Sequence, residues 1–260
     1  MLKGKTALVT GSTSGIGLGI ARALARQGAN IVLNGFGDIE SPKAEIAQLG
    51  VKVAHHGADM SRPAEIEAML KFAAKEFSRV DILVNNAGIQ HVARIENFPT
   101  ERWDAVLAIN LSSAFHATRL ALPAMQAAEN GKGWGRIINI ASVQGLVGSV
   151  EKSAYVAAKH GIIGLTKVTA LENALSGVTC NAICPGWVLT PLVQKQVDAK
   201  AAALKLSNEE AKKLLLAEKE PSMQFTTPEE LGELAVFFCS PAGNNVRGVA
   251  WNMDGGWVAQ

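Results

Sequence analysis

Short apolar runs alternate with longer helical stretches along almost the whole chain, and this alternation limits the possible folds more than any other feature. The strand-like runs are at 6–10, 30–34, 52–56, 81–86, 136–142, 178–184 and 248–253. The helical patterns are at 14–27, 63–77, 100–128, 153–175 and 227–239. Strands with continuous apolar faces, each followed by a helix, are typical of a parallel sheet covered on both sides. The sequence therefore predicts an α/β fold with a doubly wound parallel sheet of the Rossmann type, in a single domain over residues 1–260.

The segment 190–221 is the one long stretch without a strand. It follows the Pro185-Gly186 turn, contains two short helical patterns and stops at Pro221. Ligands of open α/β sheets bind beyond the carboxyl ends of the strands. A helical insertion at that place predicts a lid over the substrate. A surface or oligomer contact is the alternative interpretation.

The composition limits the possible partners and the compartment. Hydrophobic residues make up 48% of the chain, and the formal net charge is +2. The sequence has no block of five like charges, so nothing in the charge pattern points to binding of nucleic acid or of an anionic membrane. There is no signal-peptide pattern, and no apolar run reaches the ~18 residues of a membrane span. The three cysteines are few and odd in number, so we expect reduced, buried thiols and a cytoplasmic protein.

A glycine-rich turn, TGSTSGIG at 10–17, follows the first strand and opens the first helix. We expect Gly11 to allow a tight turn, Gly15 to let the backbone approach a pyrophosphate, and Gly17 to let the helix pack closely on the sheet. The start of the helix offers free N–H groups to phosphate. A structural turn is the alternative for such a motif on its own. The position directly after the first strand favours a dinucleotide.

The end of the second strand bears on the choice between NAD and NADP. An acidic residue there usually holds the adenosine ribose. Here the strand ends in Asn34-Gly35-Phe36-Gly37, and Asp38 comes late. No Arg or Lys lies there, or within the glycine-rich turn, to meet a 2′-phosphate. The absence of a cation favours NAD.

Tyr155 and Lys159 are four residues apart in a helical stretch and therefore share one face of the helix. A phenol has a pKa of about 10 and is a poor base at neutral pH. A nearby ammonium group favours the phenolate and lowers that pKa. Ser142 ends the run 136–142 at the same end of the sheet and is placed to hydrogen-bond a substrate carbonyl. Surface packing is the alternative for the pair alone, but its combination with Ser142 and the glycine-rich turn predicts an active site.

In combination, these motifs resemble the short-chain dehydrogenase/reductase superfamily. The matching stretches are TGSTSGIG at 10–17, NNAG at 85–88, Asn110, Ser142, YVAAK at 155–159 and Pro185-Gly186. The resemblance implies hydride transfer between a nicotinamide cofactor and an alcohol or ketone. It implies that Tyr155 shuttles the proton, that Lys159 holds the nicotinamide ribose and that Ser142 steadies the substrate oxygen. It also implies that Asn110 holds a water linking Lys159 to solvent.

The same resemblance implies a set of cofactor contacts, with Asp59 against the adenine edge. The expected cofactor-binding residues are Gly11, Thr13, Ser14, Gly15, Ile16, Gly17, Phe36, Asp59, Asn86, Ala87, Gly88, Tyr155, Lys159, Pro185, Gly186 and Val188. Members of the family usually form tetramers through helices that flank the sheet. A homotetramer is therefore expected.

Further stretches resemble a narrower group, the bacterial D-3-hydroxybutyrate dehydrogenases. They are LNGFG at 33–37, NNAGIQH at 85–91, KSAYVAAKHG at 152–161, NAICPGWV at 181–188, TPLVQKQ at 190–196 and DGGW at 254–257. This implies NAD-linked interconversion of a short D-3-hydroxy acid and its 3-keto acid, with a small carboxylic acid as partner. The expected substrate-binding residues are Gln90, Ser142, Gln144, Lys152, Tyr155, Trp187, Gln196 and Trp257.

Lys152 is the cation that this group would offer to the substrate carboxylate. Two positions depart from the group: Gln144 stands where it has His, and Leu189 where it commonly has Arg. Gln144 donates an amide hydrogen bond but cannot become cationic, so the carboxylate depends more heavily on Lys152. Considered alone, Lys152 could instead be a solvated lysine on the surface. Trp187 considered alone is equally well explained as a packing residue.

Three other functions are weighed against this one. A 3-oxoacyl thioester reductase of the same superfamily would use NADPH and a cation near the glycine-rich turn, and none is present. A cofactor-binding sensor without turnover would be free to lose Ser142, Tyr155 or Lys159, and all three are present. A zinc dehydrogenase needs ligand spacing that the histidines lack, since the adjacent His55 and His56 face opposite sides of a strand. We therefore expect no metal.

Overall fold

A seven-stranded sheet in the order β3-β2-β1-β4-β5-β6-β7 forms the centre of the computed structural model. The model describes residues 1–259, with side chains for all of them except Leu192. The strands are β1 Thr6–Val9, β2 Asn30–Asn34, β3 Val53–His56, β4 Ile82–Asn85, β5 Gly135–Ile140, β6 Val178–Pro185 and β7 Ala250–Met253. Adjacent strands pair in parallel throughout. The predicted parallel α/β sheet is confirmed.

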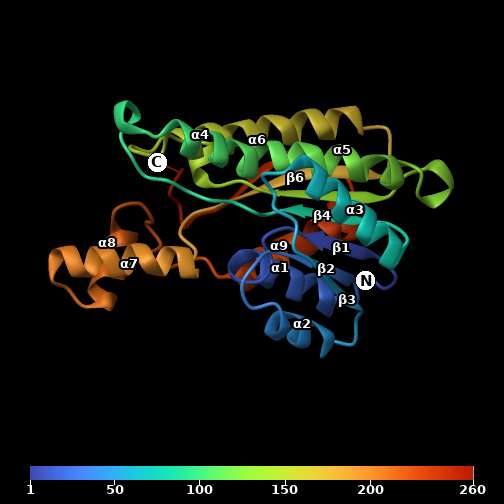
Figure 1. Ribbon diagram of the computed structural model, residues 1–260, viewed down its shortest axis with the longest axis horizontal. Coiled ribbons are helices and arrows are strands. Elements are labelled where there is room, and N and C mark those ends of the chain that lie inside the picture. Colours follow the sequence, from blue (N-terminus) through green and yellow to red (C-terminus); the bar gives the residue numbers. More distant parts are fainter. Residues whose placement is uncertain (260) are drawn as a thin grey trace.

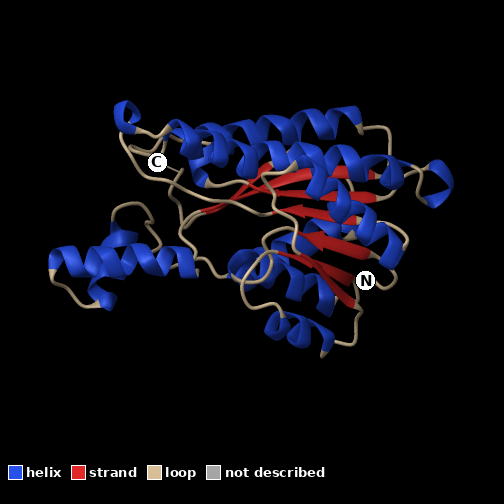
Figure 2. Ribbon diagram, viewed as in Figure 1, coloured by secondary structure: helices blue, strands red, loops and turns tan. Residues whose placement is uncertain are grey.

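Helices cover both faces of the sheet (Figure 1). One layer holds α1 Gly15–Arg26, α2 Glu40–Ala47 and α9 Pro228–Cys239, and the other holds α3 Pro63–Phe77, α4 Thr100–Leu107, α5 Ser113–Gln126 and α6 Ser153–Glu172. Figure 2 shows the strands between these two layers. Within the first layer α1 and α9 pack closely, since a Cβ on Gly232 would lie 2.7 Å from the Ala23 Cβ. Two apolar clusters, one on each side of the sheet, make up most of the core.

The strand order reverses between β1 and β4, which are neighbours in the sheet but are separated in sequence by β2 and β3. Ligands of open α/β sheets bind at such a reversal, beyond the carboxyl ends of the strands. The chain leaves β1 into the glycine-rich turn, β4 into Asn86, β5 toward Ser142 and β6 into Gly186. The fold therefore gathers the predicted motifs at one end of the sheet. The three cysteines are buried and unpaired.

The segment between β6 and α9 forms an arm that projects from the body (Figure 1). Its helices, α7 Pro191–Leu204 and α8 Asn208–Ala217, are the two short helices expected within 190–221. They share a small core of their own made by Val193, Val197, Ala201, Ala211 and Leu215. Trp187 and Phe225 pack against this cluster, so the arm contacts the body through the residues at its two ends.

Two features of the helices differ from the sequence analysis. The helix α2 was not predicted, because only Pro42 and Ile46 are buried and leave no apolar period to detect. The run expected at 100–128 is interrupted by a π-helical segment, Ala108–Ser112, between α4 and α5. By length and composition alone, Thr100–Gln126 could cross a membrane. In this fold it is instead part of a layer packed on β4, β5 and α6.

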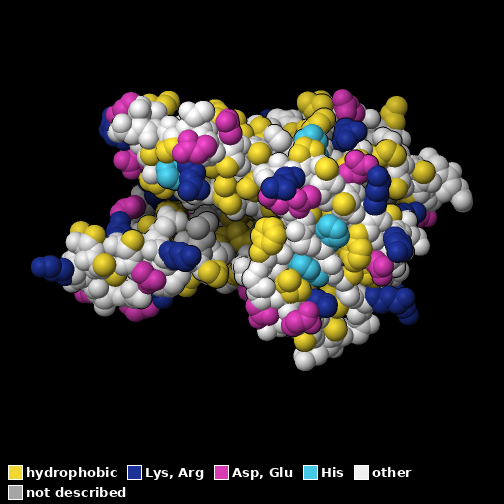
Figure 3. Space-filling view, in the orientation of Figure 1, with side chains coloured by type: hydrophobic (Ala, Val, Ile, Leu, Met, Phe, Trp, Pro, Cys, Tyr) yellow, Lys and Arg dark blue, Asp and Glu magenta, His cyan; other side chains and the backbone are white. Residues whose placement is uncertain are grey.

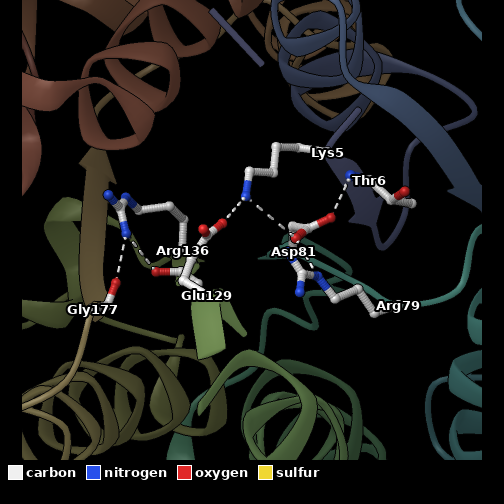
Figure 4. A network of polar contacts seen from close by, with 8 residues as sticks. Lys5, Thr6, Arg79, Asp81, Glu129, Arg136 and Gly177 are labelled. Carbon is white, nitrogen blue, oxygen red and sulfur yellow. Dashed lines mark hydrogen bonds and ion pairs between the residues drawn. The ribbon is translucent and has the colours of Figure 1, made fainter. Parts of the chain in front are cut away.

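A buried acid joins strand starts at the opposite end of the sheet (Figure 4). Asp81 is 2% exposed, and its Oδ2 accepts the Thr6 backbone N–H at 2.9 Å. Its Oδ1 accepts a hydrogen bond from Arg79 Nε at 2.7 Å. Lys5 lies 4.0 Å from the same carboxylate and pairs with Glu129 at 3.0 Å. Asp81 therefore ties the start of β1 to the start of β4.

Replacing this acid tests how far the network stabilises the sheet. Asp81→Ala should lower the free energy of unfolding by about 3 kcal/mol, because it leaves the Thr6 N–H and the Arg79 guanidinium without their partner. Urea denaturation followed by circular dichroism measures this change. The matched control Glu129→Ala removes an exposed pair and should lower stability by less than about 1 kcal/mol. Equal midpoints for Asp81→Ala and the wild type would contradict the assignment.

Candidate active site

A cavity of about 300 Å³ lies at the carboxyl ends of the central strands. It is lined by the glycine-rich turn, by the chain after β4, β5 and β6, by α6 and by the first turns of α7. The space-filling view shows the molecule hollowed between the arm and the body (Figure 3). The arm therefore forms part of the wall of the cavity.

Most of the residues predicted for the site line this one cavity. Those expected to bind substrate all do: Gln90, Ser142, Gln144, Lys152, Tyr155, Trp187, Gln196 and Trp257. The cofactor candidates that do are Gly11, Ser14, Gly15, Ile16, Asn86, Ala87, Gly88, Tyr155, Lys159, Pro185, Gly186 and Val188. Residues scattered from 11 to 257 are thus brought around one space.

Three cofactor candidates lie outside the cavity, toward the end of β2 and beyond β3. Thr13 Oγ1 donates to the Phe36 carbonyl at 2.9 Å, and the Phe36 side chain is 67% exposed. The Asp59 carboxylate accepts both the backbone N–H and the hydroxyl of Ser61 at 2.8 Å. These bonds, with help from the nearby Arg62, lower the pKa of Asp59. They hold Asp59 in a local turn.

Gly17 also lies outside the cavity, and its role is steric. A Cβ at this position would collide with the Gly11 carbonyl oxygen and with the Asn86 side chain. The close approach is therefore to the turn and to the residue after β4, rather than to the face of the sheet. Gly11 and Gly15 have φ values of 61° and 56°, which L-residues with a Cβ rarely adopt.

Hydrogen bonds fasten the glycine-rich turn to the chain after β4. Asn86 Nδ2 donates to the carbonyls of Thr10 and Gly11 at 2.8 and 2.9 Å. Thr10 Oγ1 in turn accepts the N–H groups of Asn86 and Ala87 at 2.9 and 3.0 Å. Within the described chain, α1 begins without a side-chain cap from Ser14 and without an acid in its first turn. Its first N–H groups thus suit an anionic group such as a phosphate.

Ser142 lies two residues beyond β5, not within the strand as expected. It caps a short 3₁₀ helix, where its Oγ accepts the Gln144 backbone N–H at 3.1 Å. This bond uses the oxygen as acceptor and leaves the hydroxyl proton to donate. Hydrogen bonding with the Ser142 hydroxyl lowers the pKa of the Tyr155 phenol. Serine and tyrosine therefore face each other in the cavity.

Lys159 is buried, and its Nζ donates to the Ile140 carbonyl at 2.6 Å. The same nitrogen lies 5.4 Å from the centroid of the Tyr155 ring. Burial lowers the pKa of Lys159 to about 8, with Cys184 acting in the opposite direction. The carbonyl at the end of β5 therefore fixes the ammonium beside the phenol.

The pKa of Tyr155 is shifted upward in the structure, whereas the sequence suggested a downward shift. Burial raises the pKa of Tyr155 to about 12, against a smaller lowering by Ser142. Desolvation outweighs the Ser142 hydrogen bond, while the Lys159 Nζ is directed at the Ile140 carbonyl. The chain's own groups therefore keep Tyr155 as a neutral phenol at pH 7, which is a proton donor.

Asn110 lies in the π-helical segment and does not line the cavity. Its Nδ2 donates to the Ile89 carbonyl and its Oδ1 accepts the Ile89 N–H, both at 2.9 Å. The side chain therefore fixes the loop after β4, and the expectation that it holds a water for Lys159 stays a prediction. π-helical segments are rare in proteins, and those that occur often lie at functional sites.

One end of the cavity is rich in hydrogen-bond donors. The Lys152 Nζ lies 5.5 Å from the Trp187 ring centroid, and burial lowers the pKa of this lysine. Among residues 1–259, Lys152 has no ion-pair partner, and Gln90 Nε2 and Trp187 Nε1 are buried without a hydrogen bond. The rings of Trp187 and Trp257 lie 5.8 Å apart. This end suits a small anion beside an aromatic surface.

Sequence reasoning missed several residues at the site, among them Thr190 in the cavity wall and Glu220 next to Trp187. Thr190 lines the cavity, caps α7 and lies against Gly15, where a Cβ would be 3.3 Å from the threonine methyl. The Thr-Pro pair that opens α7 was a detectable capping signal. Glu220 is 1% exposed and accepts the Trp187 backbone N–H. No motif marks Glu220, because only the folded arm brings it near Trp187.

Comparison with known proteins agrees with this geometry. The family model described as short chain dehydrogenase matches residues 5–202. The chain belongs to the short-chain dehydrogenase family. It is therefore an oxidoreductase of that family, as the motifs predicted.

Individual members of the short-chain dehydrogenase family narrow the comparison. A D-beta-hydroxybutyrate dehydrogenase of Cupriavidus necator is 69% identical over 262 residues, with full coverage of both chains. Another, from Rhizobium meliloti, is 53% identical over 98% of this chain and 99% of that protein. Among solved structures, a variant of an actinorhodin polyketide ketoreductase with NADPH superposes with a TM-score of 0.90 at 35% identity, covering 99% of each chain.

Tyr155 is the only tyrosine in the chain, so its titration can be followed directly. The ultraviolet absorbance of tyrosinate should appear only near pH 12, because burial disfavours the phenolate. The unfolded protein should titrate near the ordinary value of about 10. Circular dichroism confirms that the protein is folded at each pH, and Tyr155→Phe provides the blank. A folded-state midpoint below that of the unfolded chain would show that Lys159 dominates instead.

Proposed function

We propose that this short-chain dehydrogenase interconverts a short D-3-hydroxy acid and its 3-keto acid with NAD, and that the pair is D-3-hydroxybutyrate and acetoacetate. The observation that carries the proposal is that one cavity holds both a group of residues suited to proton transfer and a cation suited to a carboxylate. Tyr155, Ser142 and Lys159 line it together with Lys152, an ammonium without a carboxylate partner among the described residues. The identity to the Cupriavidus necator enzyme supports the same substrate.

The residues around the glycine-rich turn fit a dinucleotide. Gly11 and Gly15 provide the left-handed turn, and the start of α1 offers N–H groups to a diphosphate. At the end of β2, the described residues 34–38 include no Lys or Arg, which favours NAD over its 2′-phosphorylated form. When bound, the nicotinamide supplies the hydride acceptor or donor for the substrate carbon.

Tyr155 moves the proton in this proposal. For reduction of the ketone, the neutral phenol donates its proton to the substrate oxygen, and its raised pKa keeps that proton available at pH 7. For oxidation of the alcohol, Tyr155 acts as a base and must first lose its proton, so oxidation is favoured as the pH rises. Ser142 donates a hydrogen bond to the same substrate oxygen. Lys159 supplies positive charge beside the phenol and would hold the nicotinamide ribose.

Lys152 holds the substrate carboxylate, since burial without a counter-charge makes an anion a favourable partner. Gln90, Gln144 and Gln196 contribute amide groups around the carboxylate. Trp187 and Trp257 cover the apolar end of a four-carbon chain. Aromatic surfaces together with the cation of Lys152 make this end of the cavity selective for small acids.

The same proposal includes a lid over the cavity and an oligomeric state. The segment 190–221 acts as a lid of the single domain, because Val193 and Gln196 of α7 line the cavity. The protein forms a homotetramer through the outer faces of α5 and α6, where Phe115, Val168 and Leu171 are exposed. Apolar side chains gathered on a surface favour association.

A 3-oxoacyl thioester reductase remains the second candidate. The superposition on the polyketide ketoreductase with NADPH favours it. A neutral thioester would leave Lys152 in the cavity without an anion. Assays with an acyl thioester and NADPH therefore separate the two functions.

The decisive assay compares NAD and NADP as acceptors with each enantiomer of 3-hydroxybutyrate. We expect reduction of NAD with the D enantiomer, and rates at least ~100-fold lower in Tyr155→Phe because a general acid–base contributes that much or more. Binding of NADH, followed by its fluorescence, should be nearly unchanged in this variant. Turnover retained in Tyr155→Phe, or turnover of acyl thioesters alone, would overturn the proposal.

Charge removal at Lys152 tests the carboxylate contact. Lys152→Met keeps the length of the side chain but loses the ammonium, and should raise KM for D-3-hydroxybutyrate roughly tenfold or more, as for loss of a charged hydrogen bond. The KM for the neutral methyl ester should change little. Lys195→Met on α7 provides a matched control for charge. Equal effects of Lys152→Met on acid and ester would exclude the contact.

A further inference from the structure

Glu220 is a buried acid outside the proposed chemistry. It follows α8, with its N–H bonded to the Leu216 carbonyl at 2.7 Å. One carboxyl oxygen, Oε1, accepts the backbone N–H of Trp187, while Oε2 has no hydrogen-bond partner among the described residues. Burial of a carboxyl oxygen without a hydrogen bond costs free energy, so stability alone does not account for this acid.

The surroundings of Glu220 are built around its carboxyl group. A Cβ on Gly186 would collide with Oε1, and a Cβ on Gly255 would lie 3.4 Å from Oε2. The Ser222 N–H donates to the Gly255 carbonyl at 3.0 Å, which holds the chain after α8 against the segment after β7. The glycines leave room that a carboxyl group fills.

Glu220 joins the two ends of the arm. Trp187 is where the chain leaves β6 toward α7, and Glu220 is where it returns from α8. Beside this contact the Thr226 N–H donates to the Trp187 carbonyl at 3.0 Å, and Val188 pairs with Thr226. Both backbone groups of Trp187 are therefore held by the returning chain, one of them by the Glu220 side chain.

Trp187 connects this contact to the cavity. Its indole lies near both the Lys152 Nζ, which is 5.5 Å from the ring centroid, and the Trp257 ring, whose centroid is 5.8 Å away. A shift of the Trp187 backbone would move the surface against which Lys152 rests. The acid that follows α8 is therefore connected through Trp187 to the end of the cavity where Lys152 lies.

We propose that Glu220 is a positioning residue that holds Trp187, and through it Lys152, in the arrangement that binds the substrate carboxylate. This inference rests on the proposed function for its substrate. It concerns geometry, so the substituent at position 220 needs a hydrogen-bond acceptor of the right length rather than a charge. Gln meets this requirement, whereas Ala and Asp do not.

The first test separates KM from kcat for D-3-hydroxybutyrate. Glu220→Ala should raise KM about tenfold, the effect of one lost buried hydrogen bond, and leave kcat within about twofold because Tyr155 and Ser142 are not displaced. Glu220→Gln should restore KM to within about threefold of the wild type. Glu218→Gln, at an exposed acid two residues earlier, is the control. If Glu220→Ala does not fold, Glu220→Asp takes its place, with the same rise in KM expected.

The second test does not depend on turnover. Tryptophan emission should change in Glu220→Ala, and the change should vanish in a Trp187→Phe background, because the two positions are coupled. If no hydroxy acid is turned over, the proposed function fails and this cycle alone decides on Glu220. An unchanged KM together with an emission change independent of Trp187 would overturn the inference and leave the function standing.

Stability against pH gives a third readout. Burial, with Asp254 acting in the same direction, raises the pKa of Glu220 from 4.5 to about 7. The folded state therefore holds this proton more tightly than the unfolded state, and stability falls as the pH rises from about 5 toward 7. Glu220→Gln removes that fall, so its melting temperature should exceed that of the wild type at pH 8 and match it at pH 5. Parallel curves would show that the carboxyl group is not enclosed as described.

Discussion

The paired hydrogen bonds between Thr10 and the start of the loop after β4 are the interaction on which the site depends. They join the two strands at which the sheet reverses its order. Asn86 adds bonds to the carbonyls of the glycine-rich turn, and Asn110 fixes Ile89 further along the same loop. A parallel sheet alone would leave this crevice open and its loops free. These bonds hold the turn and the loop against each other, and catalysis by positioning requires such a defined geometry.

Burial has opposite consequences for the two neighbours on α6. Burial raises the pKa of Tyr155 and lowers the pKa of Lys159, because each group loses the solvation of its charged form. Tyr155 therefore keeps its proton more firmly, and Lys159 loses its proton more easily. Their shared environment thus favours a neutral phenol next to an ammonium that titrates near 8. Two groups whose pKa values are pushed apart in one cavity suit proton transfer in both directions. The Ile140 carbonyl sets the geometry, because it fixes the lysine nitrogen.

The sequence predicted the sheet, its covering helices and the gathering of the motifs, because each rests on local periodicity or on short spacing. The helix α2 escaped detection for lack of a buried face. The direction of the Tyr155 pKa was wrong, since desolvation depends on every element around the phenol. Glu220 could not be found at all. Its partner lies 33 positions earlier, and only the packing of the arm brings the two together.

The arm shows how a binding surface can be altered without touching the chemistry. Its helices have their own apolar core, and none of the described residues of that core comes from α6 or from a strand end. Trp187 belongs to both parts, because it packs on the arm core and also lines the cavity. A change in the arm therefore reaches the cavity through Trp187 and through Val193 and Gln196 of α7, whereas Tyr155 lies on α6. The arm and the sheet are thus separate parts of one fold, and function is determined by the site rather than by the fold.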